Sequence, residues 1–141
     1  MLLGEALEAA EVSRLLCCEA DQSHRTGERI SSRSAGLWKH GGWSVKDHLP
    51  PTESLSAKIE HVLDRVTTDK EVWRALTRRF EARLFCGIFL NNPEKLGELV
   101  CLPADLLKRA ADLGLELVLD VWPPASVPSS GPASAEDAPR G

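Results

Sequence analysis

Residues 103–122 read PADLLKRAADLGLELVLDVW and join a helix directly to a strand. Proline is favoured in the first turn of a helix and glycine just after its end, so Pro103 and Gly114 delimit a helix over 103–113. After the glycine, leucine and valine alternate with other residues over 115–122, which is the period of a β-strand. A helix that leads straight into a strand indicates a fold that contains both.

Two further strands are predicted upstream. Residues 82–90 are apolar almost throughout and end at an Asn-Asn-Pro turn, which is typical of a strand buried on both faces or nearly so. A weaker strand covers 36–45, where Gly41-Gly42 mark either a hairpin turn or a bulge.

Three more helices are predicted before residue 82. Apolar side chains recur at helical spacing over 55–66, and Ser54 is a natural N-cap. A second helix starts after Thr68, which has capping-box spacing to Glu71, and ends near residue 80. A weaker helix covers 8–17.

These elements predict an α+β fold. We expect a small, mostly antiparallel or mixed sheet of about four strands with ferredoxin-like elements and helices packed on it. The domain should span residues 1–122. Residues 123–141 hold five of the nine prolines and one large apolar residue, Val127, so we expect a disordered Pro/Ser/Ala-rich tail.

Composition excludes several classes of protein. The chain has 141 residues and a net charge of −4 without a basic run, so we expect no nucleic-acid binding. No stretch approaches about 18 consecutive apolar residues and no signal peptide is recognisable, so we expect no membrane segment and a cytoplasmic location.

The cysteines and histidines show no catalytic or metal-binding spacing. The four cysteines include no Cys-x-x-Cys and should be reduced thiols, and Cys86 should be inert because it lies within an apolar strand. The four histidines are scattered, so we expect no metal and no cofactor. An enzyme is therefore not expected, and a cysteine-dependent activity is the least favoured alternative.

The polar segment 21–33 is the best candidate for a binding site. Its histidine and arginines could cluster as an anion site. Alternatively, it is a solvated loop in which Asp21 and Glu28 neutralise the basic residues. Trp43 is either a core anchor, which we favour, or a platform for stacking a ligand. The candidate binding residues are His24, Arg25, Glu28, Arg29 and Trp43, with Arg33 as a further cation.

A series of short motifs resembles a bacterial family catalogued as domain of unknown function 4279. The motifs, in order, are Gly4-Glu5, Leu15-Leu16, Ser23-His24-Arg25-Thr26-Gly27-Glu28, Gly42-Trp43-Ser44-Val45, Leu49-Pro50, Leu84-Phe85-Cys86, Leu113-Gly114-Leu115-Glu116-Leu117 and Asp120-Val121-Trp122. The resemblance covers residues 2–122 and implies a small α+β domain without an assigned activity.

The chain departs from this family at two points. Family members carry a full strand before the Gly-Glu motif, whereas only Met1 to Leu3 precede it here, so the N-terminal edge of the sheet should be frayed or unpaired. Leu102 replaces the Ser or Thr that usually precedes Pro103, so the last helix should lack a side-chain cap.

Two functions fit these observations. The first is a non-enzymatic domain that binds another protein, as an immunity-type factor does, through its sheet or through residues 21–33. The second is a small-molecule or anion-binding module built on the same polar segment.

Overall fold

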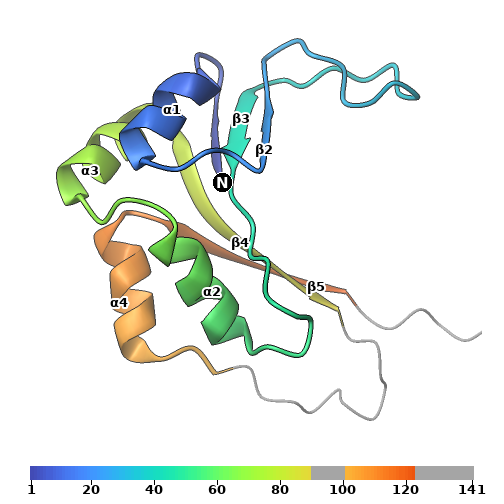
Figure 1. The fold of residues 1–141 in the computed structure, drawn as a ribbon. Coiled ribbons are helices and arrows are strands. Elements are labelled where there is room, and N and C mark those ends of the chain that lie inside the picture. Colours follow the sequence, from blue (N-terminus) through green and yellow to red (C-terminus); the bar gives the residue numbers. More distant parts are fainter. Residues whose placement is uncertain (90–100, 123–141) are drawn as a thin grey trace, which may run out of the picture.

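In the computed structural model, which describes residues 1–89 and 101–122, five strands form one mixed sheet and four helices pack on it (Figure 1). The predicted α+β class is confirmed. The predicted tail, 123–141, lies outside the described residues, and so does Leu90. The elements in chain order are β1 (Leu2–Gly4), α1 (Ala9–Leu16), β2 (Gln22–His24), β3 (Gly41–Ser44), α2 (Leu55–Asp64), α3 (Lys70–Arg79), β4 (Glu81–Phe89), α4 (Ala104–Asp112) and β5 (Glu116–Trp122).

The strands lie in the order β2-β3-β1-β4-β5. Because β3 is antiparallel to both β1 and β2, these two strands run parallel with β3 between them. The β1–α1–β2 unit is therefore a split strand–helix–strand unit, as in ferredoxin-like sheets. β4 is antiparallel to β1 and parallel to β5, and α4 lies on the connection from β4 to β5.

The short strand β1 lies at the centre of the sheet. Leu2 pairs with Trp43 of β3 on one side and with Ala82 of β4 on the other. The α-amino group of Met1 donates to the carbonyl of Arg83 at 2.8 Å, and burial lowers the pKa of this amino group to about 6. The expectation of a frayed or unpaired N-terminal edge is wrong, because β1 has a partner strand on each side.

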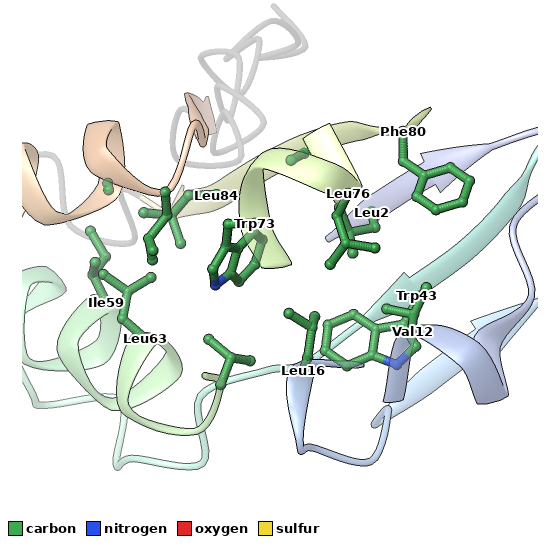
Figure 2. Close-up of a cluster of buried hydrophobic side chains, with 14 of the residues drawn as sticks. Leu2, Val12, Leu16, Trp43, Ile59, Leu63, Trp73, Leu76, Phe80 and Leu84 are labelled. Atoms are coloured by element: carbon green, nitrogen blue, oxygen red, sulfur yellow. The ribbon is translucent and has the colours of Figure 1, made fainter. Parts of the chain in front are cut away.

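The helices cover one face of the sheet and enclose a single hydrophobic core between themselves and the strands (Figures 1 and 2). Trp43, Leu2 and Ala82 are paired across three neighbouring strands. Because paired residues point to the same side of a sheet, all three side chains enter this core. Large side chains that are almost fully buried come from three strands and three helices: Leu2, Trp43, Leu84, Val12, Leu16, Leu63, Trp73 and Leu76.

The other face of the sheet is not covered by helices. Along β4, Ala82, Leu84 and Cys86 are buried, whereas Phe85 between them is 53% exposed. The prediction that 82–90 is buried on both faces is therefore wrong. An apolar strand next to the sheet edge leaves part of its apolar surface open, and such surface often serves for contacts with other molecules.

Helix caps agree with the sequence at two of three starts. The Ser54 hydroxyl accepts a hydrogen bond from Ala57 N–H, and the helix after Pro103 has no side-chain cap, as predicted. At α3, however, Asp69 is the N-cap, and its carboxylate accepts from the first free N–H groups, so the prediction of Thr68 is wrong by one residue. None of the described helices has the length and apolar character needed to cross a bilayer.

Candidate functional site

The polar segment predicted over 21–33 divides into an edge strand and a protruding arm. Residues 22–24 form β2, which we did not expect, and residues 25–40 connect β2 to β3. We call residues 25–40 the arm. Figure 1 shows the arm extending from the end of β2 and β3, on the side away from the helices. Residues 25–40 therefore project from the sheet and do not fold back along its surface.

Backbone hydrogen bonds hold the two sides of the arm together. Gly27 N–H donates to the carbonyl of Trp38, and Trp38 N–H donates to the carbonyl of Glu28, both at 2.8 Å. Arg29 and Leu37 form an isolated antiparallel bridge further along. The arm is therefore an ordered loop in which opposite residues are in register.

The base of the arm is fixed on the sheet by a stack of two rings over a glycine. His24 stacks on Trp38 with ring centroids 3.8 Å apart and an angle of 18° between the rings. A Cβ on Gly42 would lie 2.2 Å from His24 Cε1, so only glycine fits beneath this ring. The predicted turn or bulge at Gly41-Gly42 is wrong: both glycines lie within β3, and Gly42 makes room for the stack.

His24 also contains an unpaired buried atom. Its Nε2 is buried and has no hydrogen-bond partner among the described residues. Buried polar atoms without a partner are rare in proteins and often mark a place where another group binds.

Three of the predicted site residues line one groove beside the start of α1. The groove has a volume of about 710 Å³, which is the size of many small-molecule sites. Within it, Arg25 N–H donates to Glu28 Oε2 at 2.8 Å, and α1 begins without a side-chain cap. The groove is lined by Glu8, Ala9, Ala10, Ser23, His24, Arg25, Thr26, Gly27 and Glu28.

The other candidates lie elsewhere. Arg29 is exposed and lies beyond the groove, in the bridge to Leu37. Trp43 is 2% exposed and belongs to the core, where its indole N–H donates to the hydroxyl of Ser13 at 3.0 Å. Because its ring faces the helices, Trp43 offers no platform for a ligand on the open face of the sheet.

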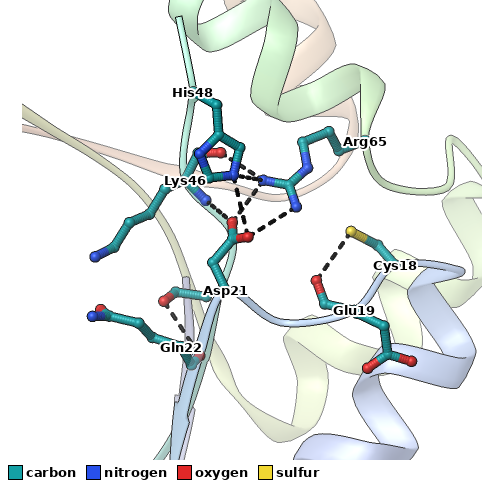
Figure 3. A network of polar contacts seen from close by, with 8 residues as sticks. Cys18, Glu19, Asp21, Gln22, Lys46, His48 and Arg65 are labelled. Carbon is teal, nitrogen blue, oxygen red and sulfur yellow. Dashed lines mark hydrogen bonds and ion pairs between the residues drawn. The ribbon is translucent and has the colours of Figure 1, made fainter.

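A second polar cluster joins the sheet to α2 (Figure 3). The carboxylate of Asp21 accepts from Arg65 Nη1 at 2.6 Å and Nη2 at 3.1 Å, and from Lys46 N–H at 2.6 Å. His48 Nε2 lies 3.3 Å from the same carboxylate. The Arg65 guanidinium, with smaller contributions from Lys46 and His48, holds the pKa of Asp21 well below its usual range, and Asp21 raises the pKa of Arg65.

The sequence did not reveal this cluster. We expected Asp21 to neutralise the basic residues of its own segment, but its partner is Arg65, 44 positions away. Asp21 lies just before β2 and Arg65 just after α2, so the pair that Figure 3 shows clamps an edge strand to a helix. A bidentate pair of this kind positions elements and leaves no free carboxylate for chemistry.

The sulfur and metal chemistry of the described residues is limited. All four cysteines are free thiols. Burial, with a smaller contribution from Asp47, raises the pKa of the Cys86 thiol, which disfavours the reactive thiolate. Among residues 1–89 and 101–122, no group of three His, Cys, Asp or Glu side chains is placed to hold a metal ion.

A surface that the sequence did not single out lies where β4 and β5 extend past the helices. Leu119 and Val121 are on the helix side of β5, and Phe85 is on the open side of β4. Each is about half exposed, as is Trp122, whose indole N–H donates to Asp120 at 3.0 Å. We call Phe85, Leu119, Val121 and Trp122 the edge patch.

The chain was compared with families, curated proteins and solved structures. A family model described as Domain of unknown function (DUF4279) matches residues 1–124, which is most of the chain. No curated protein and no solved structure matches it. The family match covers all of the described strands and helices, including β2, the arm and the edge patch. This chain therefore belongs to the DUF4279 family.

Proposed function

We propose that this chain is a non-enzymatic domain that binds another protein through β5 and the edge patch. The observation that carries this proposal is the combination of an open sheet edge with exposed apolar side chains. β5 is seven residues long and ends the sheet, and no described strand pairs with its outer edge. An extended segment of a partner can add to such an edge through backbone hydrogen bonds.

The side chains of β5 support this mode of binding. Proteins usually protect a long edge strand with charged residues, proline or a bulge. β5 has only two charged residues, Glu116 and Asp120, and both are on the open face. Leu119 and Val121 on the other face are 47% and 53% exposed. A partner strand on this edge would cover these two side chains.

The test is a quantitative recovery of partners from the native host. Wild-type protein and a Leu119→Arg/Val121→Arg variant are purified by the same tag, and bound proteins are quantified by mass spectrometry. Leu107→Arg is the matched control, because Leu107 is 43% exposed but lies on α4. We expect one stoichiometric partner with wild type and with the control, and its loss with the β5 variant.

Two results would contradict the proposal. One is the repeated absence of any stoichiometric partner from the native host. The other is a partner that the wild type and the β5 variant retain equally while both remain folded by circular dichroism.

A finer version of the proposal is that the chain is an immunity-type factor. Its net charge of −4 would favour the approach of a basic toxin, since opposite charges speed association. Co-expression tests this version: growth should be restored when the chain is produced together with a toxin encoded next to it. If the neighbouring genes in several genomes encode no toxin, the finer version fails and the general one stands.

The groove beside α1 supports a second candidate function, the binding of a small anion. The specific observation is the buried, unpaired Nε2 of His24 together with the uncapped start of α1. The carboxylates of Glu8 and Glu28 line the same groove and oppose an anion, which is why we rank this function second.

A thermal-shift screen with phosphate and carboxylate compounds tests the second candidate, because a ligand that binds only the folded state must raise the midpoint. We expect Arg25→Ala to remove the shift and Arg78→Ala, at an exposed cation on α3, to preserve it. A hit that survives Arg25→Ala would count against this site.

A further inference from the structure

The arm differs in charge from the rest of the molecule. It carries four cationic side chains and one acidic one, which gives it a net charge of +3. Since the whole chain has a net charge of −4, the remaining residues together carry −7. The cationic side chains of the arm are Arg25, Arg29, Arg33 and Lys39.

None of these four cations has a carboxylate partner among the described residues. Most cations in the rest of the described chain have a carboxylate partner. The cations in ion pairs are Arg65, Lys70, Arg74, Arg79, Arg83, Lys108 and Arg109. The arm therefore gathers positive charge without carboxylate partners, whereas most other cations of the described residues have one.

The arm also exposes apolar surface. Ile30 is 48% exposed and Leu37 is 54% exposed. Arg29 and Leu37 are opposite each other in the bridge, so an apolar and a cationic side chain lie side by side. A surface of this composition fits a ligand that offers carboxylates and apolar side chains together.

The arm is ordered before any partner binds. Its hydrogen-bonded sides and the His24–Trp38 stack over Gly42 fix it to the sheet. Thr26 adds a tie to the body by donating its hydroxyl hydrogen to the carbonyl of Glu5 at 2.8 Å. A prearranged surface loses less conformational entropy when it binds, which increases affinity.

We propose that the arm binds an acidic segment of a partner protein, with its carboxylates on Arg29 and Arg33 and its apolar side chains on Ile30 and Leu37. A protein segment fits better than nucleic acid or an anionic membrane, because the remaining −7 charge of the chain repels an extended polyanion. A partner that is basic overall can still offer one acidic segment to the arm.

This inference rests on the proposed function only in that the partner is a protein, since the arm and the edge patch are different surfaces. The probe is a fluorescein-labelled peptide in which glutamate and leucine alternate, and binding is followed by fluorescence anisotropy at low salt. A peptide in which lysine replaces glutamate, a single-stranded DNA and phosphatidylserine vesicles are tested in parallel.

We compare wild type with Arg29→Glu/Arg33→Glu and with a control that changes the net charge equally, Lys58→Glu/Arg78→Glu. Lys58 and Arg78 lie on α2 and α3, and neither forms an ion pair within the described residues. We expect the Glu/Leu peptide to bind to the wild type. Its affinity for the arm variant should be lower by about tenfold or more, because two surface ion pairs are lost. The control should lose less than about threefold, and added salt should weaken binding.

Tighter binding of DNA or vesicles than of the Glu/Leu peptide would overturn the inference. So would an equal loss with the arm and control variants, or no binding of the Glu/Leu peptide by wild type. An Arg29→Gln/Arg33→Gln variant is a second control, because it removes the two charges without reversing them and is less disruptive to the fold. This variant must also weaken binding. The Leu119→Arg/Val121→Arg variant should bind the peptide normally, so failure at the arm is distinguishable from failure at β5.

Discussion

At the scale of single residues, two side chains contact residues that are distant in the sequence and not the charged residues next to them in the chain. The sequence left open whether His24 joins the arginines that follow it; in the fold its ring stacks on Trp38 above Gly42. Asp21 was predicted to neutralise the same arginines, but it pairs with Arg65. The residue types that carry polar chemistry were visible in the sequence, whereas their partners depend on which strands become adjacent.

Gly42 gives a prediction at this scale. Gly42→Ala should destabilise the protein by about 1–3 kcal/mol, because the new methyl group would overlap the His24 ring and push the ring and Trp38 aside. Urea denaturation followed by circular dichroism measures the loss.

The matched control is the same substitution in a His24→Ala background. There the methyl group has room, so Gly42→Ala should cost less than it does in the wild-type background. An equal cost in both backgrounds would show that the glycine is needed for the strand itself and not for the ring above it.

At the scale of elements, the sequence predicted all four helices and the two longest strands. Helical stripes and strand alternation are local patterns, and segments such as 55–66 and 115–122 are long enough to display them. β1 and β2 have three residues each, which is too short to display a period. β2 is also polar, because it is an edge strand that leaves Gln22 and Ser23 exposed. Tertiary pairing alone defines both strands.

The start of α3 gives a prediction for an element. Asp69→Ala should lower the free energy of unfolding by about 1 kcal/mol, because Glu71 N–H and Val72 N–H both lose their acceptor. Thr68→Ala, the change at the residue that the capping-box pattern favoured, should fall within about 0.5 kcal/mol of wild type. Thermal or urea melts of the two variants decide between the caps. A larger loss for Thr68→Ala would show that α3 begins one residue earlier.

At the scale of the whole molecule, the arm and the edge patch mark the two ends of one sheet. β2 and β3 lead into the arm, and β4 and β5 carry the edge patch. Figure 1 shows the arm and the far ends of β4 and β5 extending away from the helices. The class of fold was predictable from the elements, but this separation of a cationic arm from an apolar edge follows from the strand order, which no local pattern encodes.

The clamp between Asp21 and Arg65 predicts how stability responds to acid. The folded pKa of Asp21 lies below its unfolded value of about 3.9, so the carboxylate stabilises the fold above that pH. This contribution is lost as the pH falls from about 5 toward the folded pKa. Because the pair is partly exposed and screened by solvent, Asp21→Asn should therefore cost about 1 kcal/mol near neutral pH and progressively less in acid.

Urea denaturation at a series of pH values measures this difference. Glu60→Gln is the control, since Glu60 is exposed on α2 and forms no ion pair within the described residues. The two variants should differ at neutral pH, and the difference should begin to shrink below about pH 4 and vanish only as the pH approaches the folded pKa of Asp21, well below the unfolded carboxyl value. A cost for Asp21→Asn that is constant across the series would mean that the carboxylate's charge does not contribute.

The central position of β1 has a consequence for synthesis on the ribosome. Leu2 is made before its partner Ala82, which follows 80 residues later. Until then, an apolar strand must remain without one of its two neighbours, and the sheet cannot close. Long-range pairing of this kind slows folding and leaves an apolar segment exposed in the meantime. The growing chain therefore has a period, which ends when β4 emerges, in which β1 is open to chaperones and to aggregation.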